Sequence, residues 1–143
     1  MKILDVNVLI YLSDPTDERH VRVRDYIERA LKSSERLGIP WLSIVGFLRI
    51  VTRRIAGRSL VSRELAERFV AELLAHPSIE IVEPGPKHWS ILRELALAGD
   101  VRGDLYPDAH LAALAVEHEA EILSSDSDFA RFTRLKWTDP TRV

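Results

Sequence analysis

The chain has 143 residues, a formal net charge of −2 and no cysteine, and nearly half of its residues are hydrophobic. This length suits one domain with a proper core, so we expect residues 1–143 to form a single domain. The lack of cysteine excludes disulfides and thiolate metal sites, and the small net charge gives no overall electrostatic case for nucleic-acid binding.

The sequence contains neither a membrane span nor an export signal. Its longest apolar runs are far too short to cross a bilayer, and its first residues lack the basic-then-apolar pattern of a signal peptide. We therefore expect a soluble, cytoplasmic protein with no membrane partner.

The first element is predicted to be a buried strand that ends in a carboxylate. Residues 2–4 have strand character and run directly into Asp5, and an apolar stretch follows Asn7. Such a strand is typical of the centre of an open α/β sheet, where ligands bind at the carboxyl edge. Asp5 could cap the short helix expected over residues 6–13, or it could belong to a site at that edge.

The next segment predicts two helices separated by a short strand. Mixed charged and apolar residues favour an amphipathic helix over residues 17–37, with Gly38 as its C-terminal cap. Residues 39–42 are expected to form the strand, and Ser43 is expected to cap a helix over residues 44–56.

That second helix has two different faces. Its buried stripe is expected to contain Ile44, Phe47, Leu48, Val51 and Ile55. Gly46, Arg49 and Arg53 lie on the opposite side, and the surrounding residues 49–63 contain five arginines and no acid.

The remaining elements alternate between helices and strands. We expect Gly57 to end the helix over residues 44–56. In chain order there follow a helix capped by Ser62 and running to about residue 75, a strand over 79–82, a helix over 87–98 ended by Gly99, a helix begun by Pro107 and running to about 118, a strand over 121–125, a helical turn through Phe129, and a last strand over 135–137. This alternation implies a mainly parallel sheet with helices on both faces.

Several aspartates are placed to meet at one edge of that sheet. Asp126 follows an apolar strand as Asp5 does, and Asp128 is two residues further on. Asp108 shares a helix face with apolar residues that pack on the sheet, although an acid in a first helical turn is favourable in any protein. Asp104 could reach the same cavity or could simply start the helix.

Carboxylates that converge in this way need a counter-charge. All-oxygen ligands select Mg²⁺ or Mn²⁺, and such an ion can activate water for attack on a phosphodiester. The five histidines show no ligand spacing, so we expect surface or local hydrogen-bonding roles for them. The three tryptophans, Trp41, Trp89 and Trp137, are expected in the core.

Four blocks of the sequence resemble the PIN domain, specifically the VapC-type toxin ribonucleases of toxin–antitoxin pairs. They are residues 4–9 (LDVNVL), 41–49 (WLSIVGFLR), 104–115 (DLYPDAHLAALA) and 122–129 (ILSSDSDF). The resemblance implies a PIN-domain-like α/β/α sandwich and a Mg²⁺-dependent endoribonuclease, with Mn²⁺ as an alternative ion. It also implies an RNA substrate such as tRNA, a homodimer, and a VapB-type antitoxin whose tail occupies the active-site groove.

The resemblance carries over to individual residues. Asp5, Asp108 and Asp126 match the family's metal-binding, catalytic aspartates, Asp128 matches a less constant acid, and Asn7 matches a supporting polar residue.

One position departs from the family's pattern. Many PIN domains have a glutamate where this chain has Gly46, three residues after Ser43. We group Ser43 with the supporting residues of the site. Either the aspartates suffice, or Asp104 joins the metal ligands in place of the glutamate, or the protein is weakened.

The helix over residues 44–56 also carries a candidate RNA-binding surface on the face away from its apolar stripe. Arg49 and Arg53 lie on the helix that borders the acidic site, and we expect them to contact RNA phosphates. A solvated helix face would explain them equally well.

Two other functions compete with the ribonuclease. A haloacid-dehalogenase-type phosphatase also places an aspartate after its first strand, but it needs a second acid where this chain has Asn7. A PIN-like module that binds RNA or a partner without cutting stays open because of Gly46.

Overall fold

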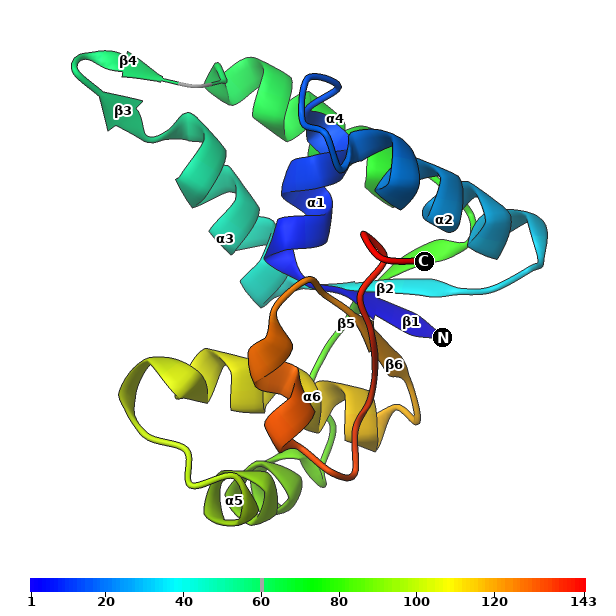
Figure 1. The fold of residues 1–143 in the computed structure, drawn as a ribbon, viewed down its shortest axis with the longest axis vertical. Coiled ribbons are helices and arrows are strands. Elements are labelled where there is room, and N and C mark those ends of the chain that lie inside the picture. Colours follow the sequence, from blue (N-terminus) through cyan, green and yellow to red (C-terminus); the bar gives the residue numbers. More distant parts are fainter. Residues whose placement is uncertain (60) are drawn as a thin grey trace.

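The protein is described by a computed structural model that covers residues 1–59 and 61–143 (Figure 1). The first part of the chain forms β1 (Lys2–Leu4), α1 (Val6–Ser13), α2 (His20–Lys32), β2 (Leu37–Pro40), α3 (Trp41–Thr52), β3 (Arg54–Ile55), β4 (Arg58–Ser59) and α4 (Arg63–Leu74). The second part forms β5 (Ile79–Val82), α5 (His88–Ala98), the 3-10 turn η1 (Gly103–Leu105), α6 (Tyr106–Glu117), β6 (Glu121–Leu123), the 3-10 turn η2 (Ser127–Arg131) and β7 (Lys136–Thr138).

Five of these strands form one parallel sheet in the order β5-β2-β1-β6-β7. The first strand is central, as its apolar character predicted. Helices α1 to α4 lie on one side of the sheet and α5 and α6 on the other, which gives the predicted α/β/α sandwich (Figure 1). Because all five strands run the same way, their carboxyl ends share one edge, and both Asp5 and Asp126 follow strands there.

Neighbouring residues of the central strands serve opposite faces of the sheet. Leu4 and Leu123 join the core on the side of α1 to α4. Ile3 and Ile122 join the core on the side of α5 and α6, as strand alternation requires. The α6 side of this second core is rich in alanine, so α6 can approach the sheet closely and hold its first turn near the carboxyl edge.

The first long helix is shorter than the sequence predicted. Helix α2 ends at Lys32, and Ser34 then takes a positive φ of 63°. Gly38 is not its cap but an interior residue of β2, so that prediction was wrong. A Cβ at position 38 would clash with the Val82 side chain of β5, which is why glycine fits there.

The predicted boundaries of the next helix were also wrong. Helix α3 begins at Trp41, directly after β2, and ends at Thr52, so Ser43 lies inside its first turn and is not its cap. Beyond it, β3 and β4 pair in an antiparallel hairpin that projects from the body (Figure 1). Ala56 and Gly57 both have positive φ in its two-residue turn, so Gly57 shapes a hairpin and does not end a helix. Ile55 is consequently exposed instead of joining the buried stripe.

The other predicted elements were confirmed within a few residues. Ser62 caps α4 by accepting a hydrogen bond from the Leu65 backbone, and Gly99 follows α5. Pro107 lies in the first turn of α6. Among the helices of the described residues, we find none that combines the length and apolar character needed to cross a membrane.

Candidate metal centre

Asp5 is the N-terminal cap of α1 and the most buried of the predicted site acids. Its Oδ1 accepts a hydrogen bond of 2.7 Å from the Val6 backbone at the start of α1. Its Oδ2 accepts hydrogen bonds from the Asn7 side chain at 3.0 Å and from the Ser124 hydroxyl at 2.6 Å. The carboxylate is only 8% exposed, and these donors compensate for its burial. Of the two interpretations left open by the sequence, the cap is confirmed, and a role of Asp5 in a metal site stays a prediction.

Ser124 connects the two strand ends that carry the acids. This fully buried residue follows β6, and its hydroxyl accepts hydrogen bonds from the Asn7 side chain at 2.9 Å and the Asp126 backbone at 3.0 Å. Asn7 in turn accepts a hydrogen bond from the Ser125 backbone at 3.1 Å. Ser124 and Ser125 were predicted as strand residues and not as site residues, because a hydroxyl after an apolar run has no distinctive signal of its own.

Three aspartates from two elements converge beside this network. Asp126 caps η2 by accepting a hydrogen bond of 2.9 Å from the Asp128 backbone, and Asp108 is the third residue of α6. Each of the three offers a carboxylate oxygen, and these atoms lie within 4.8 Å of one another. The cluster lies at the carboxyl edge of the sheet, next to Asp5.

Burial and neighbouring acids raise the pKa of Asp108 and Asp5. Burial and the charges of Asp126, Asp5 and Asp128 raise the pKa of Asp108 from 3.8 to about 6. Burial also raises the pKa of Asp5, and Asp126 adds to the effect. Like charges this close favour protonation of one of them or binding of a cation. Three carboxylates without a nitrogen or sulfur ligand fit a hard divalent cation.

Arg131 is a positive charge at the rim of the cluster. Its guanidinium donates to the Gly99 carbonyl at 3.0 Å and lies 4.0 Å from the Asp128 carboxylate. It opposes the rise in the pKa of Asp108 without cancelling it. The acidic site therefore retains a net negative charge.

The other predicted site residues lie outside this cluster. Asp104 is exposed in η1 and is not among the three aspartates that converge. Ser43 is buried in α3, and its hydroxyl has no hydrogen-bond partner among the described residues. Gly46 faces α1: a Cβ there would lie 3.4 Å from Val6 Cγ2, an ordinary contact beside Asp5.

The two predicted RNA-binding arginines are both exposed. Arg49 lies in the last turn of α3, whereas Arg53 follows the end of the helix in extended backbone. They therefore do not share one helical face as expected. The side chain of Arg58, in the same basic stretch, lies outside the described part of the chain.

The histidines make local hydrogen bonds, as expected. His88 and His110 join α5 to α6 through a ring-to-ring hydrogen bond of 2.9 Å. His20 and His118 contact backbone carbonyls, and His76 accepts a hydrogen bond from a backbone amide.

The expected burial of the tryptophans was wrong for two of them. Trp41 is 51% exposed at the start of α3, and Trp89 is 67% exposed on α5. Trp137 is partly buried and donates to the Ser124 carbonyl at 2.8 Å.

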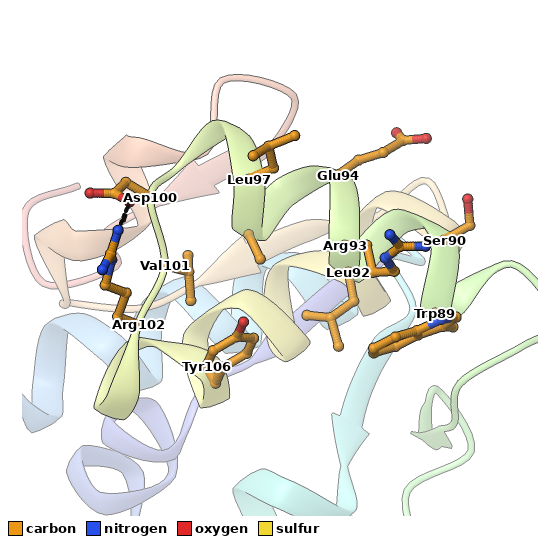
Figure 2. A pocket seen from close by; sticks show the side chains of 11 residues that line it. Trp89, Ser90, Leu92, Arg93, Glu94, Leu97, Asp100, Val101, Arg102 and Tyr106 are labelled. Atoms are coloured by element: carbon orange, nitrogen blue, oxygen red, sulfur yellow. Dashed lines mark hydrogen bonds and ion pairs between the residues drawn. The ribbon is translucent and has the colours of Figure 1, made fainter.

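Trp89 lies beside a groove of about 820 Å³ between α5 and the segment that leads into α6 (Figure 2). Its apolar lining includes Leu92, Leu97 and Tyr106. None of the clustered aspartates lines it. The groove is therefore a separate surface from the acidic site.

The sequence matches a known protein family and is similar to named proteins. A family model described as the PIN domain matches residues 2–135. The chain is 40% identical over 140 residues to Ribonuclease VapC37 of Mycobacterium tuberculosis, covering 98% of this chain and 97% of that protein. It is 41% identical over 140 residues to VapC ribonuclease Mb2897 of Mycobacterium bovis, covering 98% of this chain and 95% of that protein.

The fold is similar to that of a protein chain in a solved, DNA-bound structure. The crystal structure of VapBC2 from Rickettsia felis, bound to a DNA fragment from their promoter, matches with a TM-score of 0.73 and 16% sequence identity. The match covers 96% of each chain. At this identity the likeness concerns the fold alone.

Proposed function

The chain belongs to the PIN-domain family, and from this premise we propose that it is a Mg²⁺-dependent endoribonuclease, the toxin of a type II toxin–antitoxin pair. The observation that carries the proposal is the convergence of Asp108, Asp126 and Asp128 beside the buried Asp5. The relatives named as VapC ribonucleases support the substrate class. We further propose that residues 1–143 act as one PIN domain in the cytoplasm.

The acids would divide the work of holding the cation. Asp108, Asp126 and Asp128 have oxygens close enough to share one ion. Both oxygens of Asp5 already accept hydrogen bonds, so we assign to it mainly charge and the positioning of its neighbours. We leave Asp104 out of the ligand set because it is exposed and apart from the cluster.

The proposed reaction is hydrolysis of an RNA phosphodiester at this cluster. A bound Mg²⁺ or Mn²⁺ would lower the pKa of a coordinated water and offset charge on the phosphodiester. A bound cation would lower the pKa of Asp108, which is about 6 without one, and so favour its ionised form. Arg131 at the rim would attract the RNA backbone to an otherwise acidic surface.

The partners follow from the proposed toxin role. We propose a VapB-type antitoxin as the inhibitor, in keeping with the complex of Rickettsia felis. We propose a homodimer that covers the groove beside Trp89, where Leu97 is 86% exposed and Tyr106 is also exposed. Burial of such side chains against a second copy would remove apolar area from water.

The test is cleavage of a mixed RNA pool with Mg²⁺, with EDTA, and with the variant Asp108→Asn. Asp108 is preferable to Asp5, whose replacement by asparagine would place an amide against the donors of Asn7 and Ser124. We expect EDTA to stop cleavage and Asp108→Asn to lower it by more than roughly 100-fold, beyond the effect of residues that only support a metal site. Undiminished cleavage in EDTA would contradict the proposal.

A non-cleaving PIN-like module that binds RNA or a partner is the alternative. The observation that favours it is Gly46, which leaves no acid at a position that faces Val6, the residue after Asp5. RNA binding without cleavage at any Mg²⁺ or Mn²⁺ concentration would support this alternative.

A further inference from the structure

We propose that Tyr11 is a positioning residue of the metal centre, which it serves by fixing Ser125 and hence the segment that carries Asp126 and Asp128. This inference rests on the proposed metal centre. It concerns a hydrogen bond that crosses from α1 to the segment after β6, with an O–O distance of 3.0 Å.

Two residues of α1 jointly hold Ser125 in place. Asn7 and Tyr11 are one helical turn apart, so their side chains project from the same face of α1. Asn7 accepts a hydrogen bond from the Ser125 backbone at 3.1 Å, and the Tyr11 hydroxyl meets the Ser125 hydroxyl. Ser125 immediately precedes Asp126, so both bonds restrain the entry into η2.

Arg19 holds the Tyr11 hydroxyl from its other side. Its guanidinium donates to Tyr11 Oη at 3.0 Å, and arginine has no acceptor. The tyrosine oxygen therefore accepts from Arg19, and its own hydrogen stays available for Ser125 Oγ, 3.0 Å away. Asp17 holds Arg19 through hydrogen bonds to Nε at 2.8 Å and Nη2 at 2.7 Å, and the guanidinium lies 4.0 Å from the centre of the Tyr11 ring.

The hydrogen bond to Ser125 is made by a buried tyrosine. Tyr11 is almost fully buried, so its hydroxyl would be costly to leave without partners. Its hydrogen bond to Ser125 restrains the residue next to Asp126. The carboxylate of Asp126 must stay near those of Asp108 and Asp128 to share a cation. Without that bond, the Asp126 segment would still be held by Ser124 and Asn7, but with more freedom around Ser125.

The test is the Mn²⁺ affinity of the whole protein, measured by electron paramagnetic resonance titration without RNA. Tyr11→Phe removes only the hydroxyl. We expect its Mn²⁺ affinity to fall between about three- and ten-fold, the change that loss of one ordinary hydrogen bond produces. The matched control is Tyr26→Phe on α2, whose ring lies 5.8 Å from the Lys2 ammonium at the opposite end of β1. It should bind Mn²⁺ as the wild type does.

A double-mutant cycle separates positioning from general loosening of the fold. Ser125→Ala should weaken Mn²⁺ binding as Tyr11→Phe does, and the double variant should be no weaker than either single one. Additive losses, or a wild-type affinity in Tyr11→Phe, would overturn the role of Tyr11. If Tyr11→Phe does not fold, a wild-type affinity in Ser125→Ala would overturn it equally. A wild-type protein that binds no Mn²⁺ would contradict the proposed metal centre itself.

Discussion

At the scale of single residues, Asp108 should govern how the protein without a cation responds to pH. Its folded-state pKa of about 6 lies above the ordinary 3.8, because burial and neighbouring acids disfavour its charge. The folded protein therefore holds this proton more tightly than the unfolded chain does. Its contribution to stability is complete below about pH 4 and is lost as the pH rises through about 6.

We therefore expect the melting temperature of the cation-free wild type to fall between pH 5 and pH 7 relative to that of Asp108→Asn. Thermal unfolding followed by circular dichroism in EDTA checks this, and subtraction of the variant removes the contribution of other titrating groups. A difference that stays constant over this range would contradict the perturbed pKa. Added Mg²⁺ should raise the wild-type melting temperature most at the higher pH.

Gly46 is the second residue whose consequence can be measured. A Cβ fits there in ordinary contact with Val6, so packing does not demand glycine. We expect Gly46→Ala to stabilise the fold by about 0.5–1 kcal/mol, the usual gain from replacing glycine within a helix. Urea unfolding of the two proteins measures this difference, and destabilisation would show that the α1–α3 contact is tighter than it looks.

The same position tests what replaces the glutamate of other PIN domains. Because Asp104 lies apart from the clustered aspartates, we expect Asp104→Asn to leave Mg²⁺ affinity nearly unchanged. Gly46→Glu should tighten it, since the new side chain would start against Val6, the residue after Asp5. A Mg²⁺ titration of RNA cleavage in both variants decides. If Asp104→Asn weakens Mg²⁺ binding and Gly46→Glu does not improve it, Asp104 compensates after all.

At the scale of elements, the exposed arginines at the end of α3 form the surface where RNA binding can be tested. Arg49 and Arg53 are exposed, and neither forms an ion pair with a described acid. In an Asp108→Asn background that prevents cleavage, each Arg→Ala change should reduce the salt slope of single-stranded RNA binding by about 0.7. Fluorescence anisotropy at several salt concentrations measures the slope.

Arg24→Ala on α2 is the matched control for that experiment. Arg24 is exposed but already paired with Asp25 and Glu28, so its loss should leave the slope unchanged. Equal slopes for all three variants and their parent would exclude the end of α3 from the footprint.

At the scale of the whole molecule, the groove on α5 should determine the oligomeric state. Leu97 is among its most exposed apolar side chains, so Leu97→Arg should place a charge in the proposed dimer interface and yield monomers. Size-exclusion chromatography with light scattering measures the mass. The control is Leu65→Arg on α4, an exposed leucine away from the groove, which should leave the dimer intact. A monomeric wild type, or a dimeric Leu97→Arg, would contradict this placement.

The sequence by itself determined the elements whose signals are local. The first strand, the caps of α4 and α5, and the inward direction of Asp108 all follow from residues a few positions apart, whose spacing and chemistry act on the neighbouring backbone. The predicted boundaries of α2 and α3 were wrong because non-local packing decides where these helices begin and end. Gly38 looked like a cap, but contact with Val82 made it a strand residue. The helix was predicted to continue to residue 56 and end at Gly57, but α3 ends at Thr52 and the hairpin of β3 and β4 takes its place.

The candidate site divides in the same way. Asp5, Asp108, Asp126 and Asp128 could be named from the sequence, because strand ends and a first helical turn place acids predictably at one sheet edge. Only the tertiary structure decided that Asp108, Asp126 and Asp128 come within 4.8 Å of one another while Asp104 does not. It also decided that Tyr11 meets Ser125, a contact between residues 114 positions apart. Such contacts depend on how α1 and β6 are packed together, and no local spacing in the chain encodes that.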